Sequence, residues 1–511
     1  MADSKTPKDI LSDYERRHAV AHSMGGTAKL TKRKDQGLLN ARTRLDALFD
    51  PDSFSEVGLF AFSGEDPAKA PADGKVAGYG RIAGRDVAAI SNDFTVMGAS
   101  STMVNGRKIG HMKRVASQRG MPIVFLGESS GARIPESMGA AGMGASGSDP
   151  TQYIRLRETP WAAAILGPCY GSSSWYSCLS DFRVMRKGAL LSVSSAQLVQ
   201  QATGMAVDTE ALGGWRLHSE TTGLADQVVD SDEEALEAIK KFLSYLPSHC
   251  NEAPPAVPVP AGSGDGMPAI FDLLPASRTQ VYDMKRVIRT IVDRDSFFEL
   301  KPSFGKPGIT ALARIDGRSV GIIASNPLQK GGALDTAACQ KIASFIVMCD
   351  SFNIPLVILA DVPGFGIGLE AEQKAAPARI MNYMSALQFA TVPKITIFLR
   401  KVYGQAYLNM GGGRNSDEIA VWPTAEIGFM APAAGVTVVA GLKPDDAGFN
   451  ERLAELERVT SAWTMAGHFS VQHVIRPHET RDFLIRMLDV HRMRMTHGVG
   501  RHALQNWPCY L

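Results

Sequence analysis

Two short apolar runs, each followed by a turn of small residues, stand out in the hydrophobic pattern of the chain. The first is "PIVFLGESSGAR" (122–133) and the second is "IPLVILADVPGFG" (354–366). Short apolar runs bounded by turn residues are typical of buried strands. Residues 336–349 instead place apolar side chains at three-to-four spacing, which predicts a helix that covers a sheet.

The pattern occurs twice along the chain. Four anchors share an offset of 233 residues (314 − 81, for example): Arg81 with Arg314, Pro122 with Pro355, Pro160 with Pro393, and Tyr170-Gly171 with Tyr403-Gly404. Each copy predicts a hairpin at Arg-Ile-x-Gly-Arg, a helix, a buried strand ending in a turn, and a second strand ending in Tyr-Gly. The predicted fold class is therefore α/β, built from a duplicated unit.

A segment rich in proline and glycine separates the two copies. Residues 251–266, "NEAPPAVPVPAGSGDG", cannot sustain a helix or a strand ladder. We therefore expect an N-terminal domain over 1–250, a linker over 251–266 and a C-terminal domain over 267–511.

Charge and composition narrow the possible functions. Lys and Arg number 54 and Asp and Glu 52, so the net charge of +2 gives no whole-chain attraction to nucleic acid or to an acidic membrane. No unbroken apolar run reaches the roughly 18 residues of a membrane helix, and the N-terminal residues lack the apolar core of a secretion signal. The six cysteines are scattered without a CxxC pair, which is typical of reduced thiols and not of a zinc site. We expect a cytoplasmic protein without a metal centre.

The turn after the first apolar run fits the nucleophile elbow of serine hydrolases, G-x-S-x-G, at 127–131. Ser129 could be a nucleophile, the turn could aim backbone N–H groups at a ligand, or it could be purely structural. The second copy has Val362 in place of Ser129, which favours the backbone role. Glu128 and Asp361 are the acids shared by both copies; they could form an acid/base pair, but their position favours bracing the turn.

A second pair of turns supports the backbone role. "GPCYGSSSWY" (167–176) and "RKVYGQAYLN" (400–409) bring small residues to the end of the next predicted strand. Turns of this kind can hold N–H donors close to an oxygen that gains negative charge. Two such sites suit a reaction in which two partners each become anionic; the alternative is that the small residues serve close packing.

On these residues the chain resembles the carboxyltransferase (beta) subunits of biotin-dependent acyl-CoA carboxylases, the group that contains propionyl-CoA and methylcrotonyl-CoA carboxylases. The likeness extends over most of the chain. It is carried by "ESSGARIPE", "GPCYGSSS", "ALGGWRLHSETTGLAD", "YDMKRVI", "GGALDTAACQKIASFIVMCDSFNIPLVILADVPGF", "TVPKITIFLRKVYGQAY" and "WPTAEIGFM".

The resemblance implies a crotonase-like fold (ββα superhelix) in both halves, with acyl-CoA on the N-terminal half and carboxybiotin on the C-terminal half. It implies transfer of CO2 from carboxybiotin to the α (or vinylogous) carbon of an acyl-CoA, with no side-chain base. It also implies a homo-oligomer, usually a hexamer, whose active site lies between two subunits. Biotin would be carried and charged by a partner, a biotin carboxylase and biotin carrier subunit.

The same resemblance implies the site residues. The amides of Ser130 and Gly131 would hold the thioester enolate, and those of Gln405 and Ala406 the ureido oxygen of biotin. Substrate contacts would come from Ala132, Arg133, Tyr170, Gly171, Ser172, Gly364, Phe365, Tyr403, Gly404 and Leu408.

The chain departs from the family pattern at Ser130, at Gln405 and in the run GSSS (171–174), which replaces a more glycine-rich run. Ser130 and Gln405 stand where the family has glycines, so a Cβ enters each pocket. Leu408 favours an apolar acyl group. Two alternative functions therefore stay open: a decarboxylase alpha subunit that runs the transfer in reverse, and an assembly subunit that has lost catalysis.

Overall fold

The computed structural model describes residues 6–64, 66–146, 151–496 and 502–508. The chain divides into two compact units, Met1–Ser244 and Tyr245–Leu511. The segment 251–266, expected as a linker, lies within the second unit, where the amide of Val257 donates to the carbonyl oxygen of Gly317 (3.0 Å).

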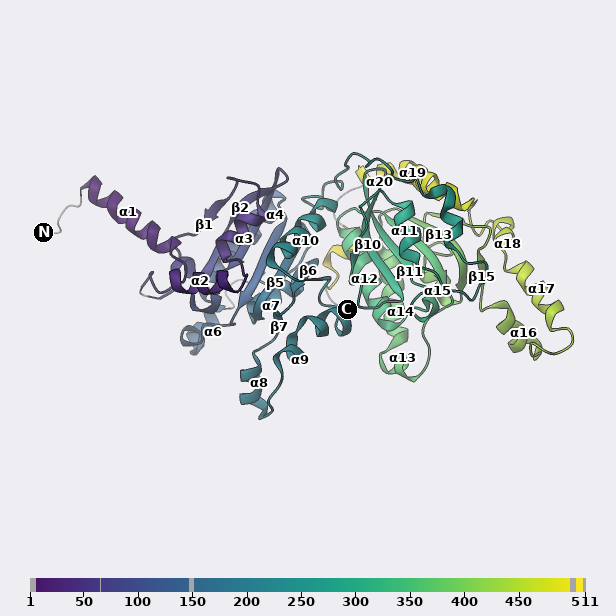
Figure 1. The fold of residues 1–511 in the computed structure, drawn as a ribbon, viewed down its shortest axis with the longest axis horizontal. Helices are drawn as coiled ribbons and strands as arrows, with labels where there is room; N and C mark the ends of the chain where they lie inside the picture. The colour runs from purple at the N-terminus through teal and green to yellow at the C-terminus, as the bar shows by residue number, and fades with distance from the viewer. Residues whose placement is uncertain (1–5, 65, 147–150, 497–501, 509–511) are drawn as a thin grey trace. The chain divides into compact units, whose positions relative to one another are not determined.

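The first unit is built on an eight-stranded sheet in the order β1-β2-β3-β4-β5-β6-β8, with β7 paired to β5 (Figure 1). Strands β1 to β3 are antiparallel, and pairing is parallel from β3 onward. The strands are β1 Ser55–Val57, β2 Lys75–Ile82, β3 Arg85–Asn92, β4 Ile123–Ser129, β5 Trp161–Tyr170, β6 Phe182–Arg186, β7 Leu190–Ser192 and β8 Gln227–Val229.

Helices α3 and α4 pack on β2 and β3 of this sheet, and α7 packs on β4 and β5. The apolar residues of α4 and the inner strands form one core cluster, which includes Met112, Phe125 and Trp161. The α-helices are α1 Pro7–His22, α2 Thr27–Asp35, α3 Ala41–Leu48, α4 Met103–Arg119, α5 Ile134–Ser137, α6 Ala140–Ser146, α7 Ser172–Leu179, α8 Ala196–Thr203, α9 Thr209–Gly213 and α10 Asp232–Tyr245.

The second unit repeats this plan in a sheet of order β16-β14-β13-β12-β11-β10-β9, with β15 paired to β13. The strands are β9 Phe298–Leu300, β10 Gly308–Ile315, β11 Arg318–Ser325, β12 Leu356–Val362, β13 Lys394–Tyr403, β14 Glu418–Val421, β15 Glu426–Gly428 and β16 His473–Val474.

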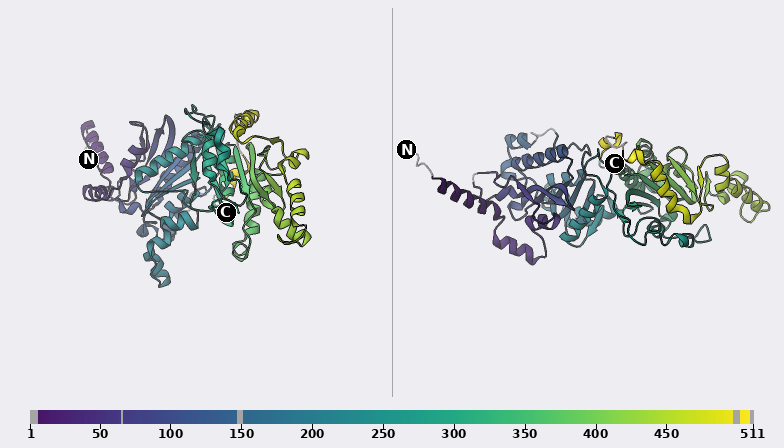
Figure 2. Two further views of the ribbon diagram at one scale, coloured as in Figure 1. Left: turned by 45° about the vertical axis from the view of Figure 1, so that its right-hand side comes forward. Right: turned by 90° about the horizontal axis from the view of Figure 1, so that it is seen from above.

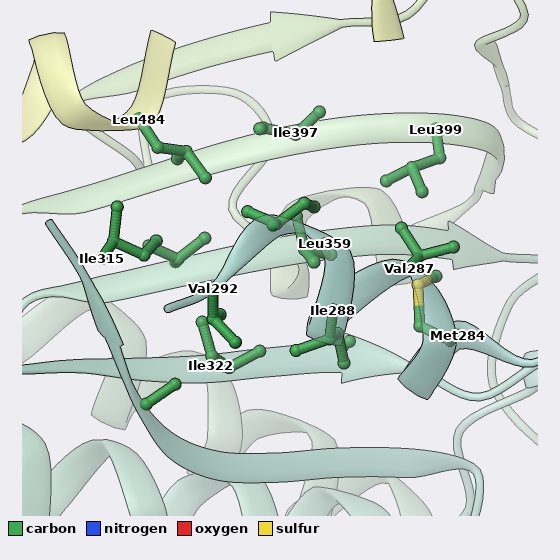
Figure 3. Close-up of a cluster of buried hydrophobic side chains, with 14 of the residues drawn as sticks. Met284, Val287, Ile288, Val292, Ile315, Ile322, Leu359, Ile397, Leu399 and Leu484 are labelled. Atoms are coloured by element: carbon green, nitrogen blue, oxygen red, sulfur yellow. The ribbon is translucent and has the colours of Figure 1, made fainter. Parts of the chain in front are cut away.

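Helix α12 covers β10 and β11, and the opposite side holds a larger apolar cluster (Figure 3). Met284, Val287 and Ile288 of the short helix α11 point into this cluster, where they meet strand residues such as Leu359 and Ile397. Helices α16 and α17, yellow-green in Figure 2, pack on each other. The α-helices are α11 Met284–Ile291, α12 Thr336–Ser351, α13 Leu369–Gln373, α14 Ala376–Phe389, α15 Gln405–Asn409, α16 Pro432–Ala440, α17 Phe449–Val459, α18 Ala462–Gly467, α19 Thr480–Val490 and α20 Arg492–Thr496.

The elements expected from the repeat are confirmed. Arg81 and Arg85 belong to the antiparallel hairpin β2–β3, and Arg314 and Arg318 belong to β10–β11. The helix predicted over 336–349 is α12. Both units also shift register between the two strands that carry the turns, at Gly127/Ser129 and at Ala360/Val362. A bulge of this kind bends a strand and redirects its end.

None of the helices in the described part of the chain is both long and apolar enough to cross a membrane.

Candidate functional site

In each unit the two predicted turns lie side by side at the carboxyl ends of neighbouring parallel strands. In the first unit, the turn after β4 forms a bridge between Ala132 and Ser101, and a Cβ added to Gly171 would lie 3.4 Å from the Cα of Gly131. In the second unit, Phe365 forms the matching bridge with Leu334. The carboxyl ends of parallel strands are where open α/β folds place their ligands.

Gly171 and Gly404 turn the chain from a strand directly into a helix. Both have φ of 60°, with ψ of −130° and −148°. A residue with a side chain pays a steric penalty in this region, whereas glycine does not. The helices α7 and α15 therefore begin at once, and their first amides, at Ser172 and Gln405, directly follow the strand-to-helix turn.

The amides of Ser130 and Gly131, predicted to hold the enolate, are engaged within their own unit. The amide of Ser130 donates to the carbonyl oxygen of Gly98 (2.9 Å) and that of Gly131 to Ser129 Oγ (3.2 Å). This geometry opposes the role that the resemblance implied for them, because an N–H bonded inside the fold is not presented to a ligand.

Other amides of the same turns are open. Among the described residues, no acceptor lies against the amide N–H of Ala132 or Ser172 in the first unit. In the second unit, the same holds for the described surroundings of Phe365, Gln405 and Ala406. Each unit thus has donors at the bridge residue and at the first turn of the following helix.

Ser129 is built as a structural residue. Its side chain is fully buried, and Oγ donates to the carbonyl oxygen of Ala99 (3.0 Å). His218 lies against the carbonyl oxygen of Leu191 (2.6 Å) and Thr222 Oγ1 (3.0 Å), and burial lowers its pKa. The serine therefore has no activating histidine among these contacts, which opposes the nucleophile hypothesis.

The shared acids Glu128 and Asp361 form buried ion pairs. Glu128 accepts two hydrogen bonds from Arg33 (2.9 and 2.5 Å) and pairs with Arg44 (2.9 Å). Asp361 pairs with Arg400 (2.8 Å) and accepts the amide N–H of Lys401 (3.2 Å). These contacts brace the strand ends, and they oppose the hypothesis of an acid/base pair.

The open amides of the first unit face a cavity of about 1010 Å³. Ala132, Gly171 and Ser172 line it, together with Ser101 from the bridge. Basic and aromatic side chains are also among its lining residues, and they come from α4, the segment before β5, β5 itself and α7: Arg107, Lys113, Arg114, Arg155, Trp161, Trp175 and Tyr176.

No sequence pattern predicts the basic side chains that line this cavity. Lys113 Nζ donates to the carbonyl oxygens of Thr151 (3.0 Å) and Gln152 (2.8 Å), and Arg155 lies 4.4 Å from the centroid of the Trp161 ring. Lys113 and Arg155 lie about 40 residues apart, and neither belongs to one of the motifs above, so only the fold brings them together.

Some of the remaining predicted residues stabilise the turns, and others lie partly exposed beside them. Arg133 is buried and bonds Asp73 Oδ1 (2.8 Å) and Ser100 Oγ (3.1 Å), so it stabilises the turn. The Tyr403 hydroxyl donates to Glu426, which braces the end of β13. Tyr170, Gly364 and Leu408 are partly exposed beside the turns.

Comparison with known proteins agrees with this architecture. The carboxyl transferase domain family matches residues 32–495. The chain is 36% identical to the methylmalonyl-CoA carboxyltransferase 12S subunit of Propionibacterium freudenreichii subsp. shermanii, over 99% of this chain and 98% of that protein. It is 34% identical to the propionyl-CoA carboxylase beta chain of Roseobacter denitrificans (94% and 96%) and 35% identical to the methylmalonyl-CoA decarboxylase subunit alpha of Veillonella parvula (91% and 92%).

Solved structures give the same result. A crystal structure of transcarboxylase 12S, described as a hexamer with methylmalonyl-coenzyme A bound, superposes with a TM-score of 0.90 at 34% identity, covering 96% of this chain and 97% of that one. The fold is therefore that of two crotonase-like domains, as predicted. The chain belongs to the carboxyl transferase family and is a carboxyltransferase of the biotin-dependent acyl-CoA carboxylase group.

Proposed function

We propose that this chain transfers CO2 between carboxybiotin, carried by a partner protein, and the α carbon of an acyl-CoA. The first unit takes the acyl-CoA and the second takes the biotin ring. The observation that carries the proposal is the set of open amides in each unit, at Ala132 and Ser172 and again at Phe365 and Gln405.

The cavity of the first unit fits a CoA thioester. Arg107, Lys113 and Arg114 supply positive charge for phosphates, and the Trp161 and Trp175 rings supply apolar surface for the uncharged parts of the ligand. The thioester oxygen lies against the amides of Ala132 and Ser172. Their hydrogen bonds strengthen as this oxygen becomes negative, which lowers the barrier to forming the enolate.

The second unit provides equivalent amide donors for the ureido oxygen of biotin. The amides of Phe365, Gln405 and Ala406 stabilise the charge that the ring gains when CO2 leaves. The biotin would supply the CO2 and, once the CO2 has left, would also supply the base for the α-proton, so the chain itself needs no side-chain base. Glu128 and Asp361 are held in ion pairs, which agrees with a mechanism that uses no side-chain base.

We further propose a cytoplasmic homohexamer that works with a biotin carboxylase and biotin carrier partner. The 12S relative assembles as a hexamer. In the proposed assembly, the acyl-CoA unit of one subunit faces the biotin unit of another.

The test uses proline to remove one N–H. Ser172 is the first residue of α7, a position where proline is well tolerated, and the preceding Gly171 has no Cβ to clash with it. Ser172→Ala keeps the amide and loses only the hydroxyl, so it is the matched reference for Ser172→Pro. Decarboxylation of methylmalonyl-CoA by the chain with free biotin is the assay.

We expect kcat for Ser172→Pro to fall about 100-fold below that of Ser172→Ala, the usual effect of losing one oxyanion donor. Equal kcat values in two folded variants would contradict the proposed site. Absence of any CoA-ester turnover by the unmodified hexamer would support the assembly-subunit alternative.

A second candidate is a decarboxylase alpha subunit, which runs the same transfer from acyl-CoA to biotin. The 35% identity to the decarboxylase subunit of Veillonella parvula favours keeping it. Isolation of the native complex decides between the two, because a biotin carboxylase partner supports carboxylation and a membrane-bound ion pump supports decarboxylation.

A further inference from the structure

Two serine hydroxyls meet at the open amides of the first unit. Ser101 Oγ and Ser172 Oγ are 2.6 Å apart, and both residues line the cavity. Ser101 lies on the bridge with Ala132, and Ser172 begins α7. The pair therefore joins the two elements that present the N–H donors.

One proton of the pair is left over. Two hydroxyls carry two protons, and the bond between them uses one. Among the described residues, neither oxygen has a second hydrogen-bond partner. Whichever serine donates to the other, the remaining O–H is available to an acceptor in the cavity, because both residues line it.

The fold does not require this pair. The equivalent positions in the second unit, offset by 233 residues (334 − 101 and 405 − 172), are Leu334 and Gln405. The second unit forms the same bridge and the same strand-to-helix turn with an aliphatic side chain and an amide side chain. The serine pair is thus a feature of the first site and not of the scaffold.

We propose that the Ser101–Ser172 pair is a third hydrogen-bond donor to the thioester oxygen of the acyl-CoA. This inference rests on the proposed function. Ser172 then contributes twice to one oxygen, through its amide N–H and through its hydroxyl, and Ser101 orients that hydroxyl. No covalent bond forms; the hydroxyl proton strengthens its bond to the oxygen as the enolate develops.

Serine variants can distinguish the contribution of the hydroxyl pair from that of the backbone amides. Ser172→Ala removes the donor and lowers kcat about tenfold, the value of one hydrogen bond to a charged group, and raises KM by a smaller factor of about two. Ser101→Ala leaves the Ser172 hydroxyl unoriented and lowers kcat about threefold. The double variant equals Ser172→Ala alone, because the two residues act as one donor. Ser344→Ala, which removes a hydroxyl bonded within α12, is the control for serine loss outside the site.

A binding measurement tests the pair without turnover. Propionyl-CoA carries a thioester oxygen, and its thioether analogue S-propyl-CoA does not. Calorimetry on the intact assembly should show that Ser172→Ala weakens propionyl-CoA binding relative to S-propyl-CoA, while thermal unfolding stays unchanged.

The outcomes distinguish the two proposals. If the unmodified protein binds and turns over CoA esters but Ser172→Ala matches it in kcat and in thioester preference, the serine pair is not a donor. If the unmodified protein binds no CoA ester, the proposed function itself fails, and the pair fails with it. Additive losses in the double variant would also overturn the single-donor arrangement.

Discussion

Lys341 Nζ donates a 2.8 Å hydrogen bond to the carbonyl oxygen of Gly308, at the start of the first long strand of the second unit. The same ammonium also bonds the carbonyl oxygens of Lys301 (2.8 Å) and Phe304 (3.1 Å). Lys108 stands at the equivalent position of the first unit and bonds the carbonyl oxygen of Lys75 there. A buried lysine in each unit thus connects the covering helix, α4 or α12, to the loop that precedes the long strand β2 or β10.

Replacement of Lys341 by methionine should destabilise the second unit. The variant keeps the volume of the side chain but leaves three buried carbonyl oxygens without their donor. We expect the free energy of unfolding to fall by about 2–4 kcal/mol, measured by urea denaturation. Lys330→Met, at an exposed ion pair with Asp335, should cost less than about 1 kcal/mol. Equal losses in the two variants would contradict the role of the buried ammonium.

Lys75 should make stability depend on pH in a defined direction. Burial lowers the pKa of its ammonium to about 7, against the raising effect of Asp73. Between pH 7 and the ordinary lysine pKa of about 10.4, the unfolded chain binds more protons at this site than the folded one, so stability rises with pH. Below pH 7 both states are protonated and the contribution becomes flat.

The matched comparison is Lys75→Met. From pH 7 to pH 9, the free energy of unfolding of the unmodified protein should rise relative to the variant, by at most about 1.4 kcal/mol per pH unit. Guanidinium titrations at both pH values measure this difference. A constant difference across the range would mean that Lys75 keeps its ordinary pKa in the fold.

Glu128→Gln separates bracing from catalysis. The carboxylate pairs with two buried guanidinium groups, and its loss leaves Arg33 without its carboxylate partner, whereas Arg44 keeps its ion pair with Asp232. We expect a loss of about 3–5 kcal/mol in unfolding free energy. A variant with unchanged stability but abolished turnover would instead identify Glu128 as an acid or base.

Ser129→Ala should keep at least about a tenth of the activity. Its hydroxyl bonds the carbonyl oxygen of Ala99 inside the fold, so its loss costs about 1 kcal/mol of stability and leaves the open amides in place. Steady-state kinetics on the folded variant provide the measurement. Near-total loss of turnover would restore the nucleophile hypothesis.

The duplicated fold was predictable because its signals are local. Hairpins at Arg-Ile-x-Gly-Arg and the amphipathic helix over 336–349 follow from short-range patterns, and the constant offset joined them into two units. The repeat also placed the turns at neighbouring strand ends. The repeat did not predict the order in which the strands pair within each sheet.

The choice of amides was not predictable in the same way. Whether Ser130 or Ala132 presents its N–H depends on Gly98, which lies some 30 residues earlier in the sequence and accepts the bond from Ser130 in the fold. The repeat held one usable signal, since the bridge residues Ser101 and Leu334 share the 233-residue offset. The cavity-lining Lys113 and Arg155 carried no signal, because their meeting depends on the packing of α4.

Because the chain is duplicated, each position in one unit can be compared with its equivalent in the other unit. Features present in both units, such as Gly171 with Gly404 and Lys108 with Lys341, mark what any copy needs in order to fold. Positions where the units differ, such as Ser101 against Leu334, are free to respond to the ligand. A substitution at such a position can therefore change the half-reaction in one unit without changing the half-reaction in the other unit.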